Sequence, residues 1–139
     1  MTFSDAVSAC DSWYPAATLT SISSSAEEAL VYNLFPSPYD PKWIGFVLNH
    51  SDTTSLIPFY WLDGSTVTYQ NFHAGYPNNL GGNEGYVTMG NLHMPSADDW
   101  DDLDGSQLLH SVCKRTVQCL FCESIWIYHI TDSHGFSAV

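Results

Sequence analysis

The order of the secondary-structure signals is the feature that most limits the folds open to this chain. Before residues 36–41, apolar residues recur at helical spacing, and after them only short β-prone runs follow. Pro36, Pro38 and Pro41 separate the two parts, because proline cannot continue a helix. Helices that precede a set of short strands indicate an α+β fold. At 139 residues, the chain suits one domain with one core.

Two helices are predicted in the first part of the chain. The first covers residues 2–13 and the second residues 23–35, and each begins with serine or threonine residues that can act as caps. We expect the first helix to bury Phe3, either Ala6 or Val7, and Cys10. We expect the second helix to direct Ala26, Leu30 and Leu34 to the core.

The second part of the chain predicts short strands and one long loop. The β-branched and aromatic runs fall at residues 42–48, 59–62, 86–90, 98–102 and 108–115. Residues 73–84 show no periodicity and consist mostly of turn-forming residues. Ordinary surface loops have such a composition, and so do loops that present oxygen atoms to a metal ion.

The charge of the chain excludes several classes of partner. Lysine and arginine number 3 against 15 acidic residues, which gives a formal net charge of −12. Such a surface repels phosphate backbones and anionic lipid, so we expect no nucleic-acid partner. We also expect no membrane insertion, since no apolar run reaches about 20 residues. Divalent cations and neutral ligands remain compatible with this charge.

Motifs of catalysis are missing from the sequence. There is no Gly-x-Ser-x-Gly elbow, phosphate-binding loop or His-Glu-x-x-His motif. The six histidines are scattered without the spacing of metal ligands. The sequence therefore predicts a binding protein and not an enzyme.

The four cysteines stand at positions 10, 113, 119 and 122. The wide separation of Cys10 and Cys113 suits a staple between the two ends of a domain. Cys119 and Cys122 are a lone pair of thiols, short of the four ligands of a structural zinc site. Asn49-His-Ser matches a glycosylation acceptor pattern and hints at secretion, although the first ten residues are polar and do not resemble a secretion signal.

An ordered set of landmarks resembles the C-type lectin-like domain. The set comprises FSDAVSAC, ATLTSISSSAEEALV, WIGF, FYWLDGSTVTYQNF, GYPNNLGGNEGYVTM, DWDD and HSVCKR, which together span residues 3–115. The resemblance implies two helices that flank short antiparallel sheets, with a long irregular ligand-binding loop. It divides the chain into a domain at residues 1–115, without the strand that usually begins the family, and an unmatched tail at residues 116–139.

The resemblance also implies which cysteines pair. It joins Cys10 to Cys113 as the outer disulfide of the family. The inner disulfide would join the positions of Tyr86 and Gly105, so both of its cysteines are absent together. The tail contains an apolar β-prone run that could be an added edge strand, a partner surface or an adventitious extension.

In sugar-binding members of the family, one calcium ion is held by residues on both sides of a cis-proline, a later glutamate and a Trp-Asn-Asp strand. The resemblance assigns the cis-proline to Pro77. It assigns the metal ligands to Asn78, Glu84, Asp101 and Asp102, whose carboxylate and amide oxygens suit calcium. It assigns the sugar contacts to Tyr76, Asn78, Glu84 and Asp101.

Tyr76 departs from the family pattern. A phenol stays protonated at neutral pH and is a poor calcium ligand, so one carboxylate is lost there. Asp101 stands where the family commonly has asparagine, so one carboxylate is gained. We therefore expect one weak calcium site. Tyr76 itself has two open readings: a plain surface aromatic residue, or a stacking platform for a sugar.

Two functions follow from these residues. The first is a secreted, calcium-dependent lectin that binds a carbohydrate or glycoprotein, and the second is a calcium-independent module that binds a protein ligand. Glu84, Asp101 and Asp102 favour the first, whereas Tyr76 and the missing inner disulfide favour the second. A product without function also stays open, and on composition alone the asparagines of the loop are turn residues.

Overall fold

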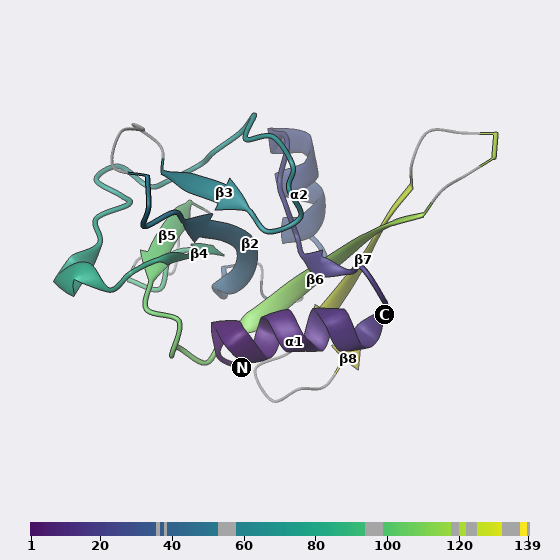
Figure 1. Cartoon of the computed structure of the whole chain (residues 1–139), viewed down its shortest axis with the longest axis horizontal. Helices are drawn as coiled ribbons and strands as arrows, with labels where there is room; N and C mark the ends of the chain where they lie inside the picture. The colour runs from purple at the N-terminus through teal and green to yellow at the C-terminus, as the bar shows by residue number, and fades with distance from the viewer. Residues whose placement is uncertain are drawn as a thin grey trace.

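Two helices lie on opposite faces of a twisted ribbon of strands (Figure 1). The computed structural model describes residues 1–35, 37, 39–52, 58–93, 99–117, 120–121, 125–131 and 137–138. The helices are α1 (Phe3–Trp13) and α2 (Ser25–Tyr32), and a short 3-10 turn, η1, covers Leu80–Gly82. No helix within these ranges has the length and apolar character needed to cross a membrane.

The strands form a mixed sheet. They are β1 (Thr18–Leu19), β2 (Lys42–Leu48), β3 (Phe59–Trp61), β4 (Tyr86–Met89), β5 (Trp100–Leu103), β6 (His110–Val117), β7 (Ile125–Thr131) and β8 (Ser137–Ala138). Their order is β5-β4-β2-β6-β7-β8, while β1 pairs with β6 and β3 pairs with β2. Among the described strands, β2 and β6 run parallel and the other pairs are antiparallel. The strands predicted from the sequence are all present.

β1 is a strand that the sequence did not predict, because two residues are too few to show a pattern. It exists through pairing, with Thr18 opposite Lys114 and Leu19 opposite Cys113. The chain then passes so close to β2 that a Cβ atom on Gly45 would lie 2.6 Å from the carbonyl oxygen of Leu19. Glycine is therefore required at position 45 by the close approach of two backbones.

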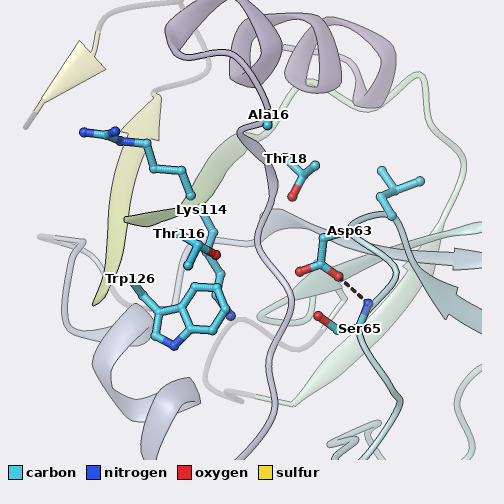
Figure 2. A pocket seen from close by; sticks show the side chains of 9 residues that line it. Ala16, Thr18, Asp63, Ser65, Lys114, Thr116 and Trp126 are labelled. Atoms are coloured by element: carbon cyan, nitrogen blue, oxygen red, sulfur yellow. Dashed lines mark hydrogen bonds between the residues drawn. The ribbon is translucent and has the colours of Figure 1, made fainter. Parts of the chain in front are cut away.

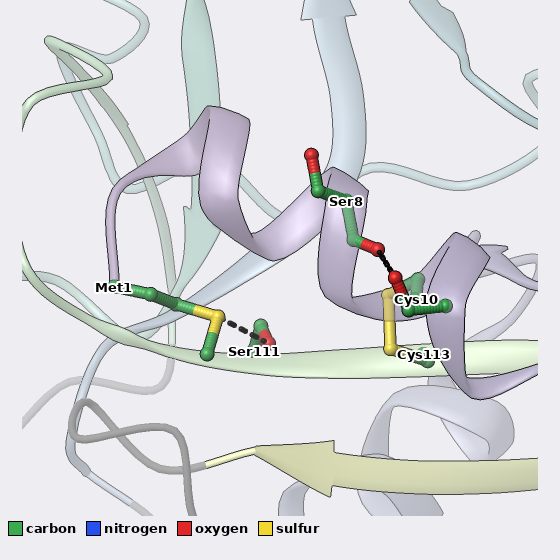
Figure 3. The surroundings of a disulfide bond; sticks show 6 residues. Met1, Ser8, Cys10, Ser111 and Cys113 are labelled. Carbon is green, nitrogen blue, oxygen red and sulfur yellow. Dashed lines mark hydrogen bonds between the residues drawn. A yellow bond between two sulfur atoms is a disulfide. The ribbon is translucent and has the colours of Figure 1, made fainter.

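α1 forms as the sequence predicts. Thr2 and Asp5 make a reciprocal capping box, and the buried face consists of Phe3, Ala6 and Cys10. Cys10 is bonded to Cys113 on β6, with 5.3 Å between their Cα atoms (Figure 3). The predicted disulfide is thus confirmed, and it fixes α1 to one face of β6.

The predicted orientation of α2 is wrong. Ala26 is exposed, and Leu30 and Leu34 are 50% and 37% exposed. Glu28 and Val31 are buried instead. The physical reason is that the Glu28 carboxylate accepts hydrogen bonds from the side chains of Trp100, Tyr69 and Asn71. These bonds outweigh the burial of two leucines. A polar residue therefore sets the rotation of this helix.

The segment after residue 115 continues the sheet. β6 extends to Val117, and β7 pairs with it along seven residues, from Ser111 opposite Thr131 to Val117 opposite Ile125. β8 then pairs with β7. β6 and β7 form the long ribbon that projects from the molecule in Figure 1. The tail thus contributes strands β7 and β8 to the sheet, and the prediction of a partner surface stays a prediction. Cys119 and Cys122 lie outside the described residues.

The two faces of the β6–β7 ribbon contact different helices. Successive residues of a strand point to opposite faces, and Cys113 faces α1 whereas Lys114 faces α2. The Lys114 ammonium, which is 4% exposed, lies 2.6 Å from the Glu27 carboxylate. The Tyr128 hydroxyl donates to the same Glu27 oxygen, also at 2.6 Å. Glu27 therefore joins α2 to both strands of the ribbon.

These contacts shift the ionisation of Glu27. Burial alone would raise the pKa of Glu27, but the hydrogen bonds from Lys114, Tyr128 and Ser23 outweigh it and lower the pKa to about 2. The carboxylate consequently stays charged at every pH near neutrality. Its charge compensates the buried ammonium of Lys114.

Aromatic side chains fill the centre of the core. The Trp100 ring is fully buried and makes edge contacts with Phe46, Trp61, Tyr69 and Phe72 at centroid distances of 5.7–5.9 Å. Its indole N–H donates to Glu28 at 2.6 Å. The buried carboxylate is thereby satisfied, and α2 is linked to β5.

The position of the missing inner disulfide is filled by a ring. A Cβ atom on Gly105 would lie 2.8 Å from the Tyr86 ring, so the two residues are complementary in size. The Tyr86 ring also packs on Phe3 of α1, with 4.3 Å between ring centroids. Packing between Tyr86 and Gly105 therefore occupies the place of a covalent link.

We predict that Glu27→Gln lowers the free energy of unfolding by about 3 kcal/mol at neutral pH, because it leaves the buried Lys114 without its counter-charge. The loss should depend on pH. A carboxylate whose folded pKa lies below its unfolded value stabilises the protein above that unfolded value, 4.5, and this contribution disappears as the pH falls toward 2. Urea unfolding of both proteins from pH 7 to pH 2 measures the difference.

The exposed Asp11 provides the matched control, since Asp11→Asn removes the same charge from α1 without touching the ribbon. Asp11→Asn should change stability by less than about 0.5 kcal/mol. Equal stability of wild type and Glu27→Gln at pH 7 would contradict the role assigned to this carboxylate.

Candidate functional site

The long loop, residues 74–85, is held at both ends by β5. At its start, Phe72 bridges to Trp100, and the His73 amide donates to the Trp100 carbonyl at 3.1 Å. At its end, Tyr86 on β4 pairs with Leu103. One short strand in the core therefore positions the whole loop.

The loop contains the turn-forming residues that its path requires. Gly75, Gly81 and Gly82 have positive φ angles, and Asn79 lies in the left-handed region with φ 45°. Asparagine tolerates this conformation better than most residues with a side chain. The peptide bond between Tyr76 and Pro77 is cis, the isomer expected at this position.

Asp102 holds the middle of the loop. Its two carboxylate oxygens accept hydrogen bonds from the amides of Asn78 at 2.9 Å and Asn79 at 2.7 Å. The residue is only 1% exposed. Such charge-assisted bonds to adjacent backbone amides fix the loop to the strand that carries Asp102.

Glu84 closes the second half of the loop. Its carboxylate accepts a hydrogen bond from the Leu80 amide at 2.6 Å. Its own amide donates to the side-chain oxygen of Asn79 at 3.1 Å. The side-chain oxygen of Asn78 lies 3.0 Å from the same Leu80 amide, so Asn78 and Glu84 meet at one point of the loop.

Asp101 points to the other side of β5, because neighbouring residues of a strand alternate. It is fully buried, and one of its oxygens lies 3.2 Å from the Nδ1 atom of His93. Its other oxygen, Oδ1, is buried without a hydrogen-bond partner. Unpaired buried carboxylate oxygens are costly, so this atom marks a place where a positively charged group would be stabilising.

The pKa values of Glu84 and Asp101 are raised. Burial is the main cause that raises the pKa of Glu84, and the charges of Asp102 and Asp101 add to it. Burial likewise raises the pKa of Asp101, although His93 opposes the shift. No lysine or arginine in the described part of the chain forms an ion pair with these three residues. The site thus carries excess negative charge.

The side chains do not converge on a single point as they stand. Within the described residues, no group of three or more histidine, cysteine or acidic side chains has the geometry to hold a metal ion. The side-chain oxygens are nevertheless of the kind that calcium binds, since they belong to carboxylates and amides. One of them, Oδ1 of Asp101, has no hydrogen-bond partner. The residues therefore fit calcium in their chemistry.

Tyr76 packs against His73. Its half-buried ring makes an edge contact with the His73 ring, with 5.8 Å between centroids. No hydrogen bond joins it to Asn78, Glu84, Asp101 or Asp102 in the described part of the loop. His73 in turn contacts Asp99 at 2.6 Å. Of the five positions assigned from the sequence, Asn78, Glu84 and Asp102 are thus joined through backbone amides of the loop. Asp101 contacts His93, and Tyr76 contacts His73.

Two residues of the site were not expected from the sequence. His93 contacts Asp101, and the Asn79 side chain orders Glu84. His93 has no spacing that connects it with an acidic residue, and only the fold brings it to β5. Asn79 stands beside Asn78 in a run of turn-forming residues. Composition does not show which of these asparagines uses its side chain to accept a hydrogen bond from Glu84.

Comparison with known proteins identifies relatives of this arrangement. The family model for the lectin C-type domain matches residues 1–115. A protein named lectin from the newt Pleurodeles waltl is 31% identical over 122 residues, which cover 86% of this chain and 67% of that protein. The chain spans about two thirds or less of the length of the curated relatives that it matches.

Solved structures show the same fold. The carbohydrate-recognition domain of cow CD23, crystallised with a GlcNAc2Man3 oligosaccharide, is 27% identical, with a TM-score of 0.68 over 86% of this chain and 83% of that chain. Herring type II antifreeze protein is 24% identical, with a TM-score of 0.69 over 85% of both chains. The second likeness concerns the fold alone.

We predict that Asp102→Asn loosens the loop, because an amide nitrogen replaces one of the two acceptors for the Asn78 and Asn79 amides. Exchange of these two amide hydrogens should become about tenfold faster, the equivalent of one lost hydrogen bond. Hydrogen exchange followed by NMR measures it, with the amides of β2 as the internal reference. Asp104→Asn is the matched control, since Asp104 accepts from Asn83 and Ser106 instead. Unchanged exchange at Asn78 and Asn79 would contradict the prediction.

Proposed function

Because this chain belongs to the C-type lectin domain family, we propose that its long loop binds carbohydrate in a calcium-dependent manner. The matching family is a lectin domain family and the relative from Pleurodeles waltl is named a lectin; lectins are binding proteins, and the protein is not an enzyme. The candidate ligand is a free carbohydrate or the glycan of a glycoprotein. Its binding would take place on residues 76–84 and on β5.

Asn78, Glu84, Asp101 and Asp102 are the residues that would hold one calcium ion. Calcium bound there would supply coordination positions for two vicinal hydroxyl groups of a sugar. Asn78, Glu84 and Asp101 would also form hydrogen bonds with the same hydroxyl groups. Carboxylates accept such bonds from hydroxyl groups more strongly than neutral oxygens do.

One observation carries this proposal: the Asp101 carboxylate is fully buried, and its Oδ1 atom has no hydrogen-bond partner. A buried charge is normally paired, because its transfer out of water is costly. Burial and neighbouring carboxylates also raise the pKa of Glu84 on the same loop. A divalent cation would relieve both the missing partner and the mutual repulsion.

The residue after the proline supports one class of sugar, although Tyr76 before the proline removes one of the expected hydrogen bonds to the sugar. Asparagine at position 78 is similar to the pattern of family members that bind mannose, fucose or N-acetylglucosamine, whereas galactose-binding members have aspartate there. The cow CD23 domain that this chain resembles was crystallised with an oligosaccharide of N-acetylglucosamine and mannose. We therefore propose a sugar of this type, with Tyr76 either as a surface aromatic residue or as a platform for the ring.

A second candidate function is a calcium-independent contact with a protein ligand. The observation that favours it is that the loop satisfies its own backbone: Asp102, Glu84 and Asn79 together provide acceptors for its amides. A loop held in this way keeps its shape without an ion. In that case Tyr76 and the exposed Leu80 would supply apolar contact area.

The disulfide supports a location outside the cytosol. Bonds such as Cys10–Cys113 form and persist in oxidising compartments, whereas cytosolic proteins keep their cysteines reduced. We therefore propose that the protein is secreted, and the exposed Asn49 of the glycosylation pattern agrees with this.

We predict that calcium stabilises the protein. A ligand that binds only the folded state adds about 2.7 kcal/mol at a hundredfold excess over its Kd, so the melting temperature should rise in millimolar calcium and return after chelation. Differential scanning calorimetry measures this shift, and magnesium at the same concentration is the control. An unchanged melting temperature would favour the calcium-independent function.

Substitutions at the two ends of the loop test the ligand set. Tyr76→Glu should tighten calcium binding, since it restores a carboxylate beside Pro77, and should lower the stability of the chelated protein through carboxylate repulsion. Glu84→Gln should weaken calcium binding by about tenfold or more. Isothermal titration with calcium measures both. No tightening in the first variant together with no loss in the second would end the calcium hypothesis.

A further inference from the structure

A cavity lies away from the long loop, between the β6–β7 ribbon and the turn after β3. Its volume is about 390 Å³. Figure 2 shows Lys114, Thr116 and Trp126 at one side and Asp63 and Ser65 at the other, with Thr18 above them. The family model matches residues 1–115, and Thr116 and Trp126 lie beyond that match. No residue of the loop at 74–85 lines this cavity.

The register of the ribbon places these side chains on one face. Thr116 lies directly opposite Trp126, and Lys114 lies opposite Tyr128. Cross-strand partners share a face of the sheet, and residues two apart along a strand also share it. The cavity is therefore a consequence of the pairing between β6 and β7.

Trp126 offers an aromatic surface at this cavity. The residue is 47% exposed, which is unusual for the largest apolar side chain. The Lys114 ammonium lies 4.0 Å from the centroid of its ring. Lys114 also donates to Glu27 and to Ser21, so its charge is compensated and its donors are occupied. A cation already occupies one position on the ring, which disfavours a second cationic ligand.

Asp63 offers charged acceptors on the opposite side. One of its oxygens accepts from the Ser21 hydroxyl at 2.6 Å, and the other accepts from the Ser65 amide at 2.9 Å. Each carboxylate oxygen retains capacity for another hydrogen bond. These contacts hold the carboxylate in place while it stays exposed to solvent. Lys114 and Arg115 also line the cavity, but Lys114 is paired with Glu27 and the Arg115 guanidinium lies 3.9 Å from the centroid of the Tyr14 ring. Asp63 thus offers its acceptors to a ligand that is rich in hydroxyl donors.

From these residues we infer that the cavity binds a neutral pyranose without calcium. A pyranose ring has an apolar face of C–H groups, which suits the exposed ring surface of Trp126, and hydroxyl groups at its edge, which suit Asp63. The hydroxyls of Thr18, Ser65 and Thr116 can donate or accept at the remaining positions. The cavity lies in the size range of small-molecule sites. This second site would act independently of the long loop.

The test is an NMR titration of the oxidised full chain in the presence of a chelator, so that any calcium site in the loop is silent. The probes are the methyl glycosides of mannose, glucose, galactose and N-acetylglucosamine. The indole N–H signal of Trp126, assigned by its loss in Trp126→Phe, should shift with millimolar affinity for at least one probe. The signals of Trp43, Trp61 and Trp100, which are at most 2% exposed, should not move.

Variants separate the two sides of the cavity. Trp126→Ala should weaken binding of the active probe by about tenfold, and Trp126→Phe should restore part of it. Asp63→Asn, which leaves the aromatic surface intact, should weaken binding by a similar factor. Tyr60→Ala is the matched control, because Tyr60 is also half-exposed, at 45%, and does not line the cavity.

The inference is overturned if no probe shifts the Trp126 indole signal, or if Asp63→Asn and Trp126→Ala bind the active probe as tightly as wild type. Binding that requires calcium and disappears in Glu84→Gln would assign the sugar to the long loop instead. A different outcome is that the protein binds no calcium while the probe still shifts the Trp126 signal in the presence of chelator. That result would support this site and contradict the proposed function of the loop.

Discussion

The hydrogen bond between the Trp100 indole and the buried Glu28 carboxylate is the contact on which the arrangement of this protein depends. It fixes the rotation of α2, links that helix to β5 and places a ring at the centre of the aromatic core. The backbone of the same tryptophan holds the start of the long loop, and the next two residues are Asp101 and Asp102. Core packing and the candidate site therefore share one short strand.

Charge is distributed in two different ways in the molecule. In the β6–β7 ribbon, the buried Lys114 is matched by Glu27, whose pKa falls to about 2 because its hydrogen bonds outweigh burial. In the loop, Glu84 and Asp101 have raised pKa values and no lysine or arginine partner in the described part of the chain. The first arrangement stabilises the fold by itself, whereas the second would be stabilised by a bound cation.

The strands after residue 115 change what the molecule can contact. β7 pairs with the full exposed edge of β6 and brings Trp126 and Tyr128 beside α2. The exposed Leu30 of that helix and Trp126 border a second hollow of about 370 Å³. The added strand thus covers one sheet edge and creates new concave surface on the face opposite α1.

The sequence alone determined the α+β class, the bounds of most elements, the capped first helix with Cys10 on its buried face, and the composition of the loop. These features depend on local spacing and turn chemistry, which are visible in any short window. Tertiary structure decided the rotation of α2, the existence of β1, the contact of His93 with Asp101 and the place of Tyr76. Each of these depends on partners distant in the chain, such as Glu28 with Trp100, and hydrophobic periodicity cannot indicate that a buried carboxylate will replace two leucines in a core.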